Sequence, residues 1–593
     1  MSDPIATSNK NKKIIVTGML VALAAIIGWI CFNVIIKATE FSASDKILPT
    51  DSISRLWYKS AVIYALDVKV FKDSDGDGVG DFIGLTQKLD YIDSLGANVI
   101  WLAPFQPSPG LDDGYDITDY TGIDKRLGTR DDFKAFITAA RKHKIRVIMN
   151  LVLNHTSIEH TWFKQARQSA LSSYKNWYTW SKERPKNYNT GMAYPGVQKD
   201  TWTYDSVAKE YYYHRYYNFQ PDLNMQYPAV QREIEKIFKY WIDMGLNGFS
   251  LNAIPYLIEV PKTTGEKFEH RFEVLTQLRS YIQGLRDDAI IVGEANVLPK
   301  DIKPYFGVNG NAMQMMYNLY VNQYLFYALA SGEVKTLKLA LEATNNIPAT
   351  AEWLQLLRNN EELDLGRLSR RQRNEVYDKF GKEKNMQLYG RGIRRRLAPM
   401  MNNNRKLIEL AYSTLFSLPG TPVIRYGEEI GMGDNLALKE RESVRTPMQW
   451  SADTAGNFTP TGKAIIPVID SGSYGYKNIN VDKQTKQSNS LLNWTRLIIK
   501  VHKQCPEISF GSRKILETDN SHLLVIRYEW QGTKLLVIHN FSKESQKLSL
   551  NKKDSGGSIL KNLFSSGENL KTGKKNIHVG LEGYGYRWYK VQP

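Results

Sequence analysis

Cysteine is scarce in this chain of 593 residues, which carries only Cys31 and Cys505. Two cysteines so far apart build neither a disulfide framework nor a cysteine-ligated metal site, so an oxidising and a reducing compartment both stay open. Internal repeats and low-complexity tracts are also lacking. Apolar residues make up 42% and charged residues 23%, which is typical of a globular protein and argues against disorder.

Negative charge is in the minority, because 78 Lys and Arg outnumber 61 Asp and Glu and give a formal net charge of +17 at pH 7. The excess is spread along the chain, and no motif of a nucleic-acid-binding module is visible. A solvated basic surface accounts for the charge, and so would a surface that faces anionic lipid or anionic polysaccharide. We therefore expect no nucleic-acid partner.

One long apolar run is present, at residues 14–36. Its length of about 23 residues suffices to cross a bilayer as a helix. Lys10, Lys12 and Lys13 precede it, so the positive-inside rule places the N-terminus in the cytoplasm. The sequence thus predicts a single-pass membrane protein with a cytoplasmic tail (1–13), a transmembrane helix (14–36), a linker (37–55) and an extracytoplasmic remainder. A cleaved signal peptide is the alternative, because FSAS at 41–44 could mimic a cleavage site, although the run exceeds the usual apolar core.

Strand-like and helix-like segments alternate after the linker, which is typical of a parallel sheet. Expected strands occupy 61–71, 97–105, 146–155, 248–254, 289–296, 352–359 and 421–429, and expected helices occupy 82–96, 131–144, 228–244 and 275–285. The pattern predicts a (β/α)₈ barrel over 56–506, with its active site at the C-terminal ends of the strands. Residues 156–223 break the alternation and predict a subdomain inserted after the third strand. The segment 507–593 changes to β character, with a hairpin around Gln531-Gly532, and predicts an all-β sandwich.

Several stretches resemble glycoside hydrolase family 13, the α-amylase superfamily, and most of all its trehalose synthase (maltose α-D-glucosyltransferase) branch. They include DVKVFKDSDGDGVGDFIGL, PFQPSPGLDDGYDITDY, LVLNHTS, QPDLN, GFSLNAIPYL, VGEAN, LLRNNEEL, YGRGIRRRLAPMM, SLPGTPVIRYGEEIGMGDN and VRTPMQW. The arginine cluster 391–396 belongs to one of these stretches and so does not indicate nucleic acid. Together with the predicted membrane anchor, the chain is also similar to the heavy subunits of heteromeric amino-acid transporters, which have an amylase-like ectodomain.

The resemblance implies a degenerate catalytic set. A retaining glycosidase needs two carboxyl groups, one that attacks the anomeric carbon and one that protonates the leaving oxygen. The family's nucleophile is the Asp of a G-F-R-x-D pattern, and here that position is Asn252 and the Arg position is Ser250. A neutral amide cannot act as the same nucleophile. Glu294, in the G-E-A-N stretch, matches the general acid/base and is interpreted either as a working acid or as an inherited pocket residue.

The third carboxylate of the family, in an N-H-D pattern, stabilises the distorted sugar ring. Here Asn360 replaces the His and Glu361 replaces the Asp. One extra methylene displaces the carboxylate by roughly 1 Å, enough to cost on the order of 10²-fold in rate. Glu361 as a substitute nucleophile is a conceivable alternative.

The resemblance also implies a glucoside-binding pocket. Asp112 and Tyr115, in DDGYD, match residues that hold the sugar at the cleavage subsite, Tyr115 by stacking. Asn154 and His155 match an N-H pair at the end of the third strand. Ser250 and Asn360 complete the set of expected substrate-binding positions. Ground-state binding can persist without catalysis, because the two depend on separable contacts.

An acidic loop follows the first strand. Its carboxylates are spaced two apart around glycines, and hard oxygen ligands at this spacing suit Ca²⁺. The resemblance implies a structural calcium site with Asp73, Asp75, Asp77, the Val79 carbonyl and Asp81 as ligands. A solvated turn is the alternative.

These observations predict a membrane-anchored, catalytically impaired protein that binds a glycan or supports a membrane partner. The first alternative is an active retaining α-glucosidase or maltose–trehalose glucosyltransferase with an unrecognised nucleophile. The second alternative is an ancillary subunit of an amino-acid transporter, which is weakened because no cysteine lies between Lys37 and Cys505 to form a disulfide with a partner.

Overall fold

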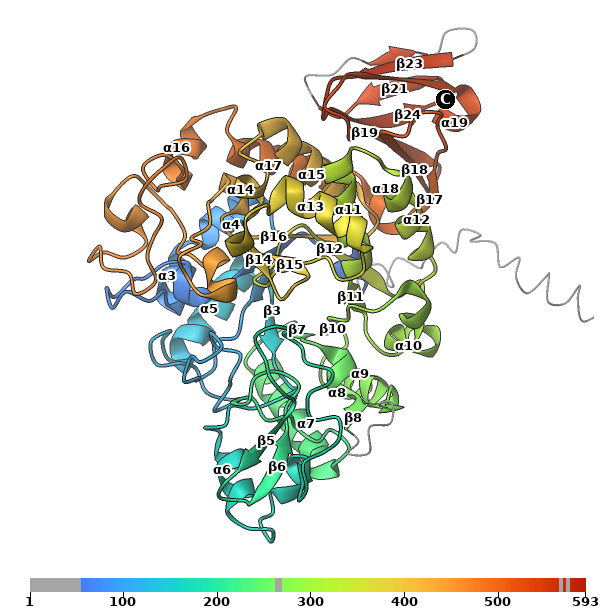
Figure 1. Ribbon diagram of the computed structural model, residues 1–593. Helices are drawn as coiled ribbons and strands as arrows, with labels where there is room; N and C mark the ends of the chain where they lie inside the picture. Colours follow the sequence, from blue (N-terminus) through green and yellow to red (C-terminus); the bar gives the residue numbers. More distant parts are fainter. Residues whose placement is uncertain (1–54, 262–268, 565–568, 572–575) are drawn as a thin grey trace, which may run out of the picture. The chain divides into compact units, whose positions relative to one another are not determined.

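The protein is described by a computed structural model over residues 55–261, 269–564, 569–571 and 576–593 (Figure 1). The apolar segment 14–36 that was predicted to cross a membrane lies outside the described residues, as do the predicted tail and nearly all of the linker. Among the residues that are described, no helix is both long and apolar enough to span a bilayer.

Eight parallel strands close a barrel, as the alternating pattern predicted. The order around the barrel is β1-β16-β12-β11-β10-β7-β3-β2. The strands are β1 (Ile63–Leu66), β2 (Val99–Leu102), β3 (Arg146–Leu151), β7 (Gly248–Leu251), β10 (Ile290–Gly293), β11 (Met315–Tyr317), β12 (Glu352–Leu356) and β16 (Thr421–Arg425). Their side chains are almost all buried, because helices cover the outside and the strands fill the inside.

The expected strands are shorter in the structure than predicted, and one barrel strand was not predicted. The segment 61–71 is a strand only as far as Leu66, because the Asp67 side chain accepts a hydrogen bond from the Lys69 backbone N–H and starts a 3₁₀ turn at Val68–Val70. The sequence analysis did not identify β11, which has only three residues and therefore too short a pattern for recognition.

Amphipathic helices surround the barrel. Helix α5 begins at a capping box formed by Thr129 and Asp132, and α7 begins with Pro228, whose missing N–H costs nothing at a first helical position. The longer helices are α3 (Phe82–Gln87), α4 (Leu89–Leu95), α5 (Arg130–Lys142), α7 (Pro228–Asp243), α9 (Glu273–Leu285), α11 (Leu319–Ser331), α12 (Lys335–Ala343), α13 (Arg370–Phe380), α15 (Arg405–Ser417) and α17 (Leu491–Lys503). Short helices α8 (Ile254–Leu257), α10 (Lys303–Phe306), α14 (Leu397–Met400) and α16 (Val481–Lys486) lie in the loops.

Two small sheets are inserted at the C-terminal ends of the barrel strands. Between β3 and α7 lie α6 (Thr161–Gln168) and the sheet β4-β6-β5, formed by Trp180–Ser181, Glu210–Tyr213 and Trp202–Asp205. After β12 lies the sheet β13-β15-β14, formed by Leu363–Asp364, Gly392–Ile393 and Gln387–Leu388. A further pair, β8 (Glu259–Val260) and β9 (Glu269–His270), follows β7. These insertions supply the wall of the cavity described below.

The C-terminal segment forms two packed antiparallel sheets, as predicted. One sheet has the order β17-β18-β19-β24-β21-β22 and the other pairs β20 with β23. The predicted hairpin joins β18 to β19, with Gln531 and Gly532 both at positive φ in its turn. The elements are α18 (Pro506–Phe510), β17 (Ser512–Ile515), β18 (Leu523–Trp530), β19 (Thr533–Asn540), β20 (Gln546–Asn551), α19 (Lys552–Ser555), β21 (Ile559–Asn562), β22 (Leu570–Lys571), β23 (Asn576–Leu581) and β24 (Tyr586–Gln592).

Candidate active site

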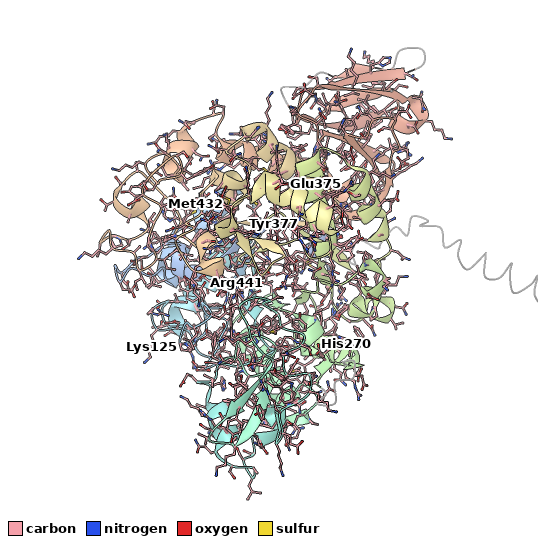
Figure 2. The ribbon with its side chains drawn as sticks, in the orientation of Figure 1. Lys125, His270, Glu375, Tyr377, Met432 and Arg441 are labelled. Carbon is pink, nitrogen blue, oxygen red and sulfur yellow. The ribbon has the colours of Figure 1, made fainter. Side chains whose placement is uncertain are left out.

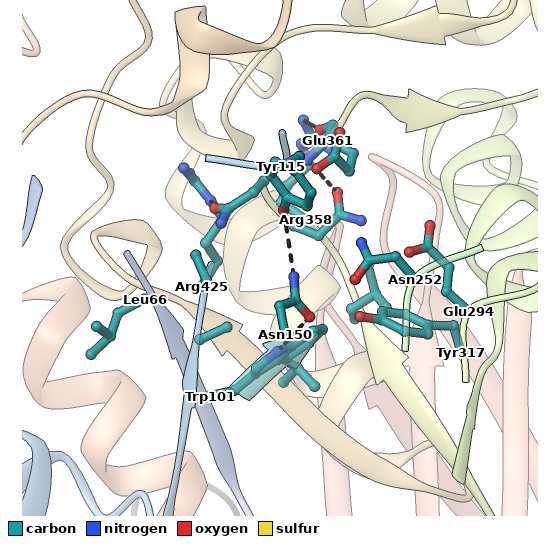
Figure 3. Close-up of a pocket in the computed structure, with 16 residues that line it drawn as sticks. Leu66, Trp101, Tyr115, Asn150, Asn252, Glu294, Tyr317, Arg358, Glu361 and Arg425 are labelled. Carbon is teal, nitrogen blue, oxygen red and sulfur yellow. Dashed lines mark hydrogen bonds between the residues drawn. The ribbon is translucent and has the colours of Figure 1, made fainter. Parts of the chain in front are cut away.

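The ends of three barrel strands carry the residues that the sequence singled out as catalytic positions. Asn252 follows β7, Glu294 follows β10 and Glu361 lies in the loop after β12. All three line one cavity of about 460 Å³, together with Asp112, Tyr115, Asn154 and His155. The three residues and Tyr115 also line a small pocket at the inner end of this cavity (Figure 3). The fold therefore brings most of the predicted site together.

Asn252 and Glu294 are held side by side by their backbones. The Glu294 N–H donates to the Leu251 carbonyl at 3.1 Å, and the Ile254 N–H donates to the Glu294 carbonyl at 3.1 Å. The side-chain oxygen of Asn252 accepts no hydrogen bond from the described residues. The amide therefore faces the cavity beside Glu294, where the family pattern expects a carboxylate (Figure 3).

Glu294 has the properties of a proton donor. Burial, followed by the negative charges of Glu361, Glu362 and Asp364, raises the pKa of Glu294 to about 8, and the positive charge of Arg441 only partly opposes this rise. A carboxyl group with this pKa keeps its proton at neutral pH, which is the state required of a general acid.

Glu361 has the opposite character. Burial alone would raise its pKa, but Arg441 and Arg445 outweigh burial and hold the pKa of Glu361 below its usual range. Arg441 donates to one carboxylate oxygen, and Arg445 donates to the other at 3.1 Å. Of the two carboxyl groups at the predicted catalytic positions, Glu294 is therefore protonated and Glu361 is ionised at neutral pH.

A chain of buried charges extends from Glu361. Arg441 also donates to Asp112, and Arg445 donates to Asp113 at 2.5 Å, while Asp113 is paired with Lys69 (Figure 2 labels Arg441). Gln220 donates to the second oxygen of Asp112 at 2.9 Å. Burial raises the pKa of Asp112 to about 6 against the opposing charges of Arg441 and Arg445. Each charged side chain in this buried series thus has a partner of opposite sign.

Tyr115, Asn154 and His155 form one side of the cavity. The His155 ring lies 3.1 Å from the Tyr115 carbonyl oxygen through Nε2, and its own carbonyl accepts a hydrogen bond from the Tyr120 hydroxyl at 2.7 Å. Burial lowers the pKa of His155 to about 4, so the imidazole is neutral at physiological pH. The guanidinium of Arg445 lies over the Tyr115 ring at 5.5 Å.

Two residues that were predicted to bind substrate do not line the main cavity. Ser250 is buried in the barrel wall, where its Oγ lies 3.3 Å from the Tyr317 hydroxyl, and it does not line the cavity. Asn360 lines only the inner end of the cavity, and its Oδ1 accepts a hydrogen bond from Arg425 Nε at 2.7 Å. The Asn360 carbonyl accepts from Arg445 at 3.0 Å. Asn360 thus helps to hold the arginines.

Aromatic side chains from the inserted segments border the cavity. Tyr194 stacks on Tyr389 with ring centroids 4.6 Å apart, and the Tyr194 hydroxyl accepts from Arg441 at 2.8 Å. Tyr216 and Tyr256 continue this wall and contact each other edge to face. Apolar ring faces beside paired charges suit a sugar, which presents C–H faces as well as hydroxyl groups.

The acidic loop after β1 brings three of its carboxylates together. Oxygen atoms of Asp73, Asp75 and Asp81 lie within 4.8 Å of one another. Asp77 does not belong to this group, and its carboxylate accepts the Val79 backbone N–H at 2.7 Å. The donor set of three carboxylates fits a hard cation such as Ca²⁺.

Sequence reasoning missed the charged partners of the site. Arg441, Arg445, Asp113 and Lys69 come from segments far apart in sequence, and only the fold brings them together. One feature of the sequence could have indicated them. Several carboxyl groups were assigned to one buried pocket, and buried negative charges require positively charged partners. Tyr317 was missed together with its strand.

Comparisons with known proteins agree with this geometry. The alpha-amylase catalytic-domain family matches residues 67–511, and the sucrose hydrolase-like C-terminal domain family matches residues 532–590. The trehalose synthase/amylase TreS of Mycolicibacterium smegmatis is 36% identical over 561 residues, which cover 92% of this chain and 94% of that protein. The trehalose synthase of Pimelobacter sp. (strain R48) is 36% identical over 549 residues, covering 90% and 96%. The crystal structure of Bacillus licheniformis trehalose-6-phosphate hydrolase has a TM-score of 0.73 at 25% identity, covering 91% of this chain and 100% of that one.

These findings overturn two predictions. The main prediction of an impaired, glycan-binding or partner-supporting protein is wrong, because relatives that match nearly the whole chain are enzymes, and the active-enzyme alternative replaces it. The predicted membrane localisation and the transporter-subunit alternative are also not retained, because the relatives that match nearly the whole chain are trehalose synthases. With three quarters of its length matched to the catalytic domain and both relatives matched end to end, the chain belongs to the α-amylase family, glycoside hydrolase family 13.

Proposed function

We propose that the protein is an active enzyme that cleaves the α-glucosidic bond of a small α-glucoside, such as maltose or trehalose, and transfers the glucosyl unit to a sugar hydroxyl or to water. The observation that carries this proposal is the pair of carboxyl groups in one cavity, Glu294 with its pKa raised and Glu361 with its pKa lowered. Two carboxyl groups held in opposite states are the usual equipment for glycoside cleavage. The names of the relatives support the choice of substrate.

In the proposed reaction, the Glu294 carboxyl donates its proton to the glycosidic oxygen as the bond to the anomeric carbon breaks. The positive charge that develops on the sugar ring is stabilised by the Glu361 carboxylate, which Arg441 and Arg445 keep ionised. Asn252 contributes no charge and serves as a neutral wall of the pocket. The Glu294 carboxylate then removes the proton from the incoming hydroxyl group, which bonds to the anomeric carbon.

The experiment uses the full chain with maltose, trehalose and an aryl α-glucoside, and it follows both glucose release and disaccharide interconversion. We expect Glu294→Gln and Glu361→Gln each to lower kcat by about 10²-fold or more, because each removes a group needed in the transition state. The matched control is Glu375→Gln on helix α13, outside the cavity.

Circular dichroism must show both site variants folded, since Glu361→Gln leaves Arg441 and Arg445 with fewer partners. The proposal would be contradicted if the wild type showed no turnover. It would also be contradicted if both variants turned over substrate as fast as the wild type.

We also propose that the loop 73–81 binds a structural Ca²⁺ ion through Asp73, Asp75 and Asp81. Asp73 is buried and accepts hydrogen bonds from the Gly76 and Gly78 N–H groups, so the loop is already folded around its carboxylates. A cation would relieve the repulsion among them. Its role would be to stabilise the loop that leads from β1 into α3.

A further inference from the structure

The cavity floor contains a tyrosine, Tyr317, that lies level with the two principal catalytic positions. In the barrel register Leu251 is opposite Gly293, and Gly293 is opposite Met316. Asn252, Glu294 and Tyr317 are the next residues along the chain after Leu251, Gly293 and Met316. They therefore lie at the same height, at the ends of three neighbouring strands. All three line the inner cavity, and Figure 3 shows the Tyr317 ring next to Asn252 and Glu294.

The ring of Tyr317 is fixed in place. Its centroid lies 5.5 Å from that of Trp101, and Trp101 is in turn held by a hydrogen bond from its Nε1 to Asn150 at 3.0 Å. The Tyr317 hydroxyl lies 3.3 Å from Ser250 Oγ. Tyr317 is 4% exposed and Ser250 is 1% exposed, so the two hydroxyl groups meet in the wall beneath the sugar space.

The contact between Tyr317 and Ser250 bears on the unusual serine of β7. The family pattern carries an arginine at position 250 and an aspartate at 252, which form a charged unit. Here the space next to Ser250 is taken by the Tyr317 hydroxyl, so an arginine does not fit there without moving the tyrosine. Positions 250 and 252 therefore contribute polar but uncharged side chains to this part of the barrel.

The protonation state of Tyr317 is also defined. Burial, followed by the charge of Glu294, raises the pKa of Tyr317 well above its usual range. The hydroxyl therefore stays protonated and can donate a hydrogen bond at every working pH, and it can do so to a bound molecule when Ser250 is the donor of their shared hydrogen bond. A donor at this level would face a sugar unit bound with its anomeric carbon between Glu294 and Asn252.

We propose that Tyr317, oriented by Ser250, is a substrate-positioning residue that binds the glucosyl unit through its hydroxyl, in the place where the family pattern uses the charged residues at 250 and 252. This inference rests on the proposed function for the identity of the sugar. Tyr317 and Ser250 would hold the ring without an ionised nucleophile at position 252 and so would suit a reaction in which Glu361 supplies the negative charge.

The first test is Tyr317→Phe, which removes the hydroxyl and keeps the ring, compared with Tyr320→Phe on helix α11, whose ring lies against Tyr324 outside the cavity. One lost hydrogen bond to the sugar corresponds to about 5- to 30-fold weaker binding. We expect the Kd for maltose, measured by calorimetry, to rise by this factor in Tyr317→Phe and to stay within twofold in Tyr320→Phe. An unchanged Kd in Tyr317→Phe would overturn the inference.

The second test is the coupling between positions 250 and 317. Ser250→Arg should lower the melting temperature by several degrees, because it overpacks the wall. Adding Tyr317→Ser should recover most of that loss, whereas adding Tyr320→Ser should not. Equal melting temperatures for wild type and Ser250→Arg would contradict the proposed packing.

The first test measures binding and the second measures stability, so both remain informative if the wild type shows no turnover. Absence of turnover with a Tyr317-dependent Kd would reject the proposed catalysis and leave the positioning role intact. Turnover with a Kd and kcat/KM that are indifferent to Tyr317→Phe would reject the positioning role alone.

Discussion

The alkaline limit of activity should be set by Glu294 and should move when a neighbouring charge is removed. The proposed reaction needs Glu294 protonated, and its pKa is about 8, so kcat/KM should fall as pH rises through about 8. Glu361 has a lowered pKa and stays ionised down to acidic pH, so activity should extend well below neutrality. The perturbation is Glu362→Gln, because Glu362 is one of the charges that raise the pKa of Glu294.

The size of the effect follows from Coulomb's law. Two unit charges roughly 8 Å apart at an effective dielectric constant of about 20 interact by about 2 kcal/mol, or about 1.5 pKa units. Burial raises the pKa of Glu362 to about 7, so Glu362 is ionised in the range in which Glu294 titrates. Removing this charge should therefore lower the alkaline limit by about one unit after relaxation of the pocket.

The assay is the pH dependence of kcat/KM from pH 5 to 10 with an aryl α-glucoside, for wild type, Glu362→Gln and the surface control Glu375→Gln. We expect limits near pH 8, near pH 7 and near pH 8, respectively. Activity that keeps rising through pH 9 in the wild type would refute Glu294 as the proton donor. A limit that does not move in Glu362→Gln would refute the electrostatic account of its pKa.

Three further outcomes follow from the same structure. Asn252→Asp places a carboxylate beside Glu294 and should raise kcat about tenfold or more, measured by glucose release; a loss of activity would show that the neutral wall is required. Asp113, buried beside Lys69 and Arg445, has a pKa of about 2, so its stabilising effect is fully present above its unfolded pKa near 4 and is lost as pH falls toward 2. The free energy of unfolding of Asp113→Asn, measured with urea, should therefore be about 2 kcal/mol below that of the wild type at pH 6. The difference should be smaller at pH 3. EGTA, which removes Ca²⁺, should lower the melting temperature of the wild type by several degrees and should not change that of Asp75→Asn. An unchanged melting temperature of the wild type in EGTA would contradict the calcium proposal.

Barrel topology was predictable because it depends on short-range patterns. Alternating strand-like and helix-like segments gave seven of the barrel strands, and motifs at their ends located Glu294 and Glu361. β11 was not predictable, since three residues, Met315 to Tyr317, do not establish a period. The roles of Ser250 and Arg445 depend on partners 67 and 84 residues away, at Tyr317 and Glu361, and no local pattern encodes such pairings.

The error about function had a different cause. The changes at positions 250, 252, 360 and 361 were together interpreted as loss of catalysis, and Glu361 was kept only as a conceivable substitute nucleophile. The structure places an ionised carboxylate, Glu361, in the same cavity as the protonated Glu294. The sequence located both residues but could not reveal that Glu361 is ionised, because Arg441 and Arg445, which come from a distant segment, set its ionisation.

The buried charges themselves favour a working site over an inert one. Burying ion pairs costs desolvation energy, and apolar side chains of similar volume would serve folding equally well or better. Yet Arg441 and Arg445 are buried among Asp112, Asp113 and Glu361, with exposed side-chain fractions of 5% and 3% for the two arginines. This arrangement adds little to the stability of the barrel, but it fixes a carboxylate in its ionised state at the edge of a polar cavity. Such a fixed charge is useful where positive charge develops on a bound molecule, as it does on a glucosyl unit during cleavage.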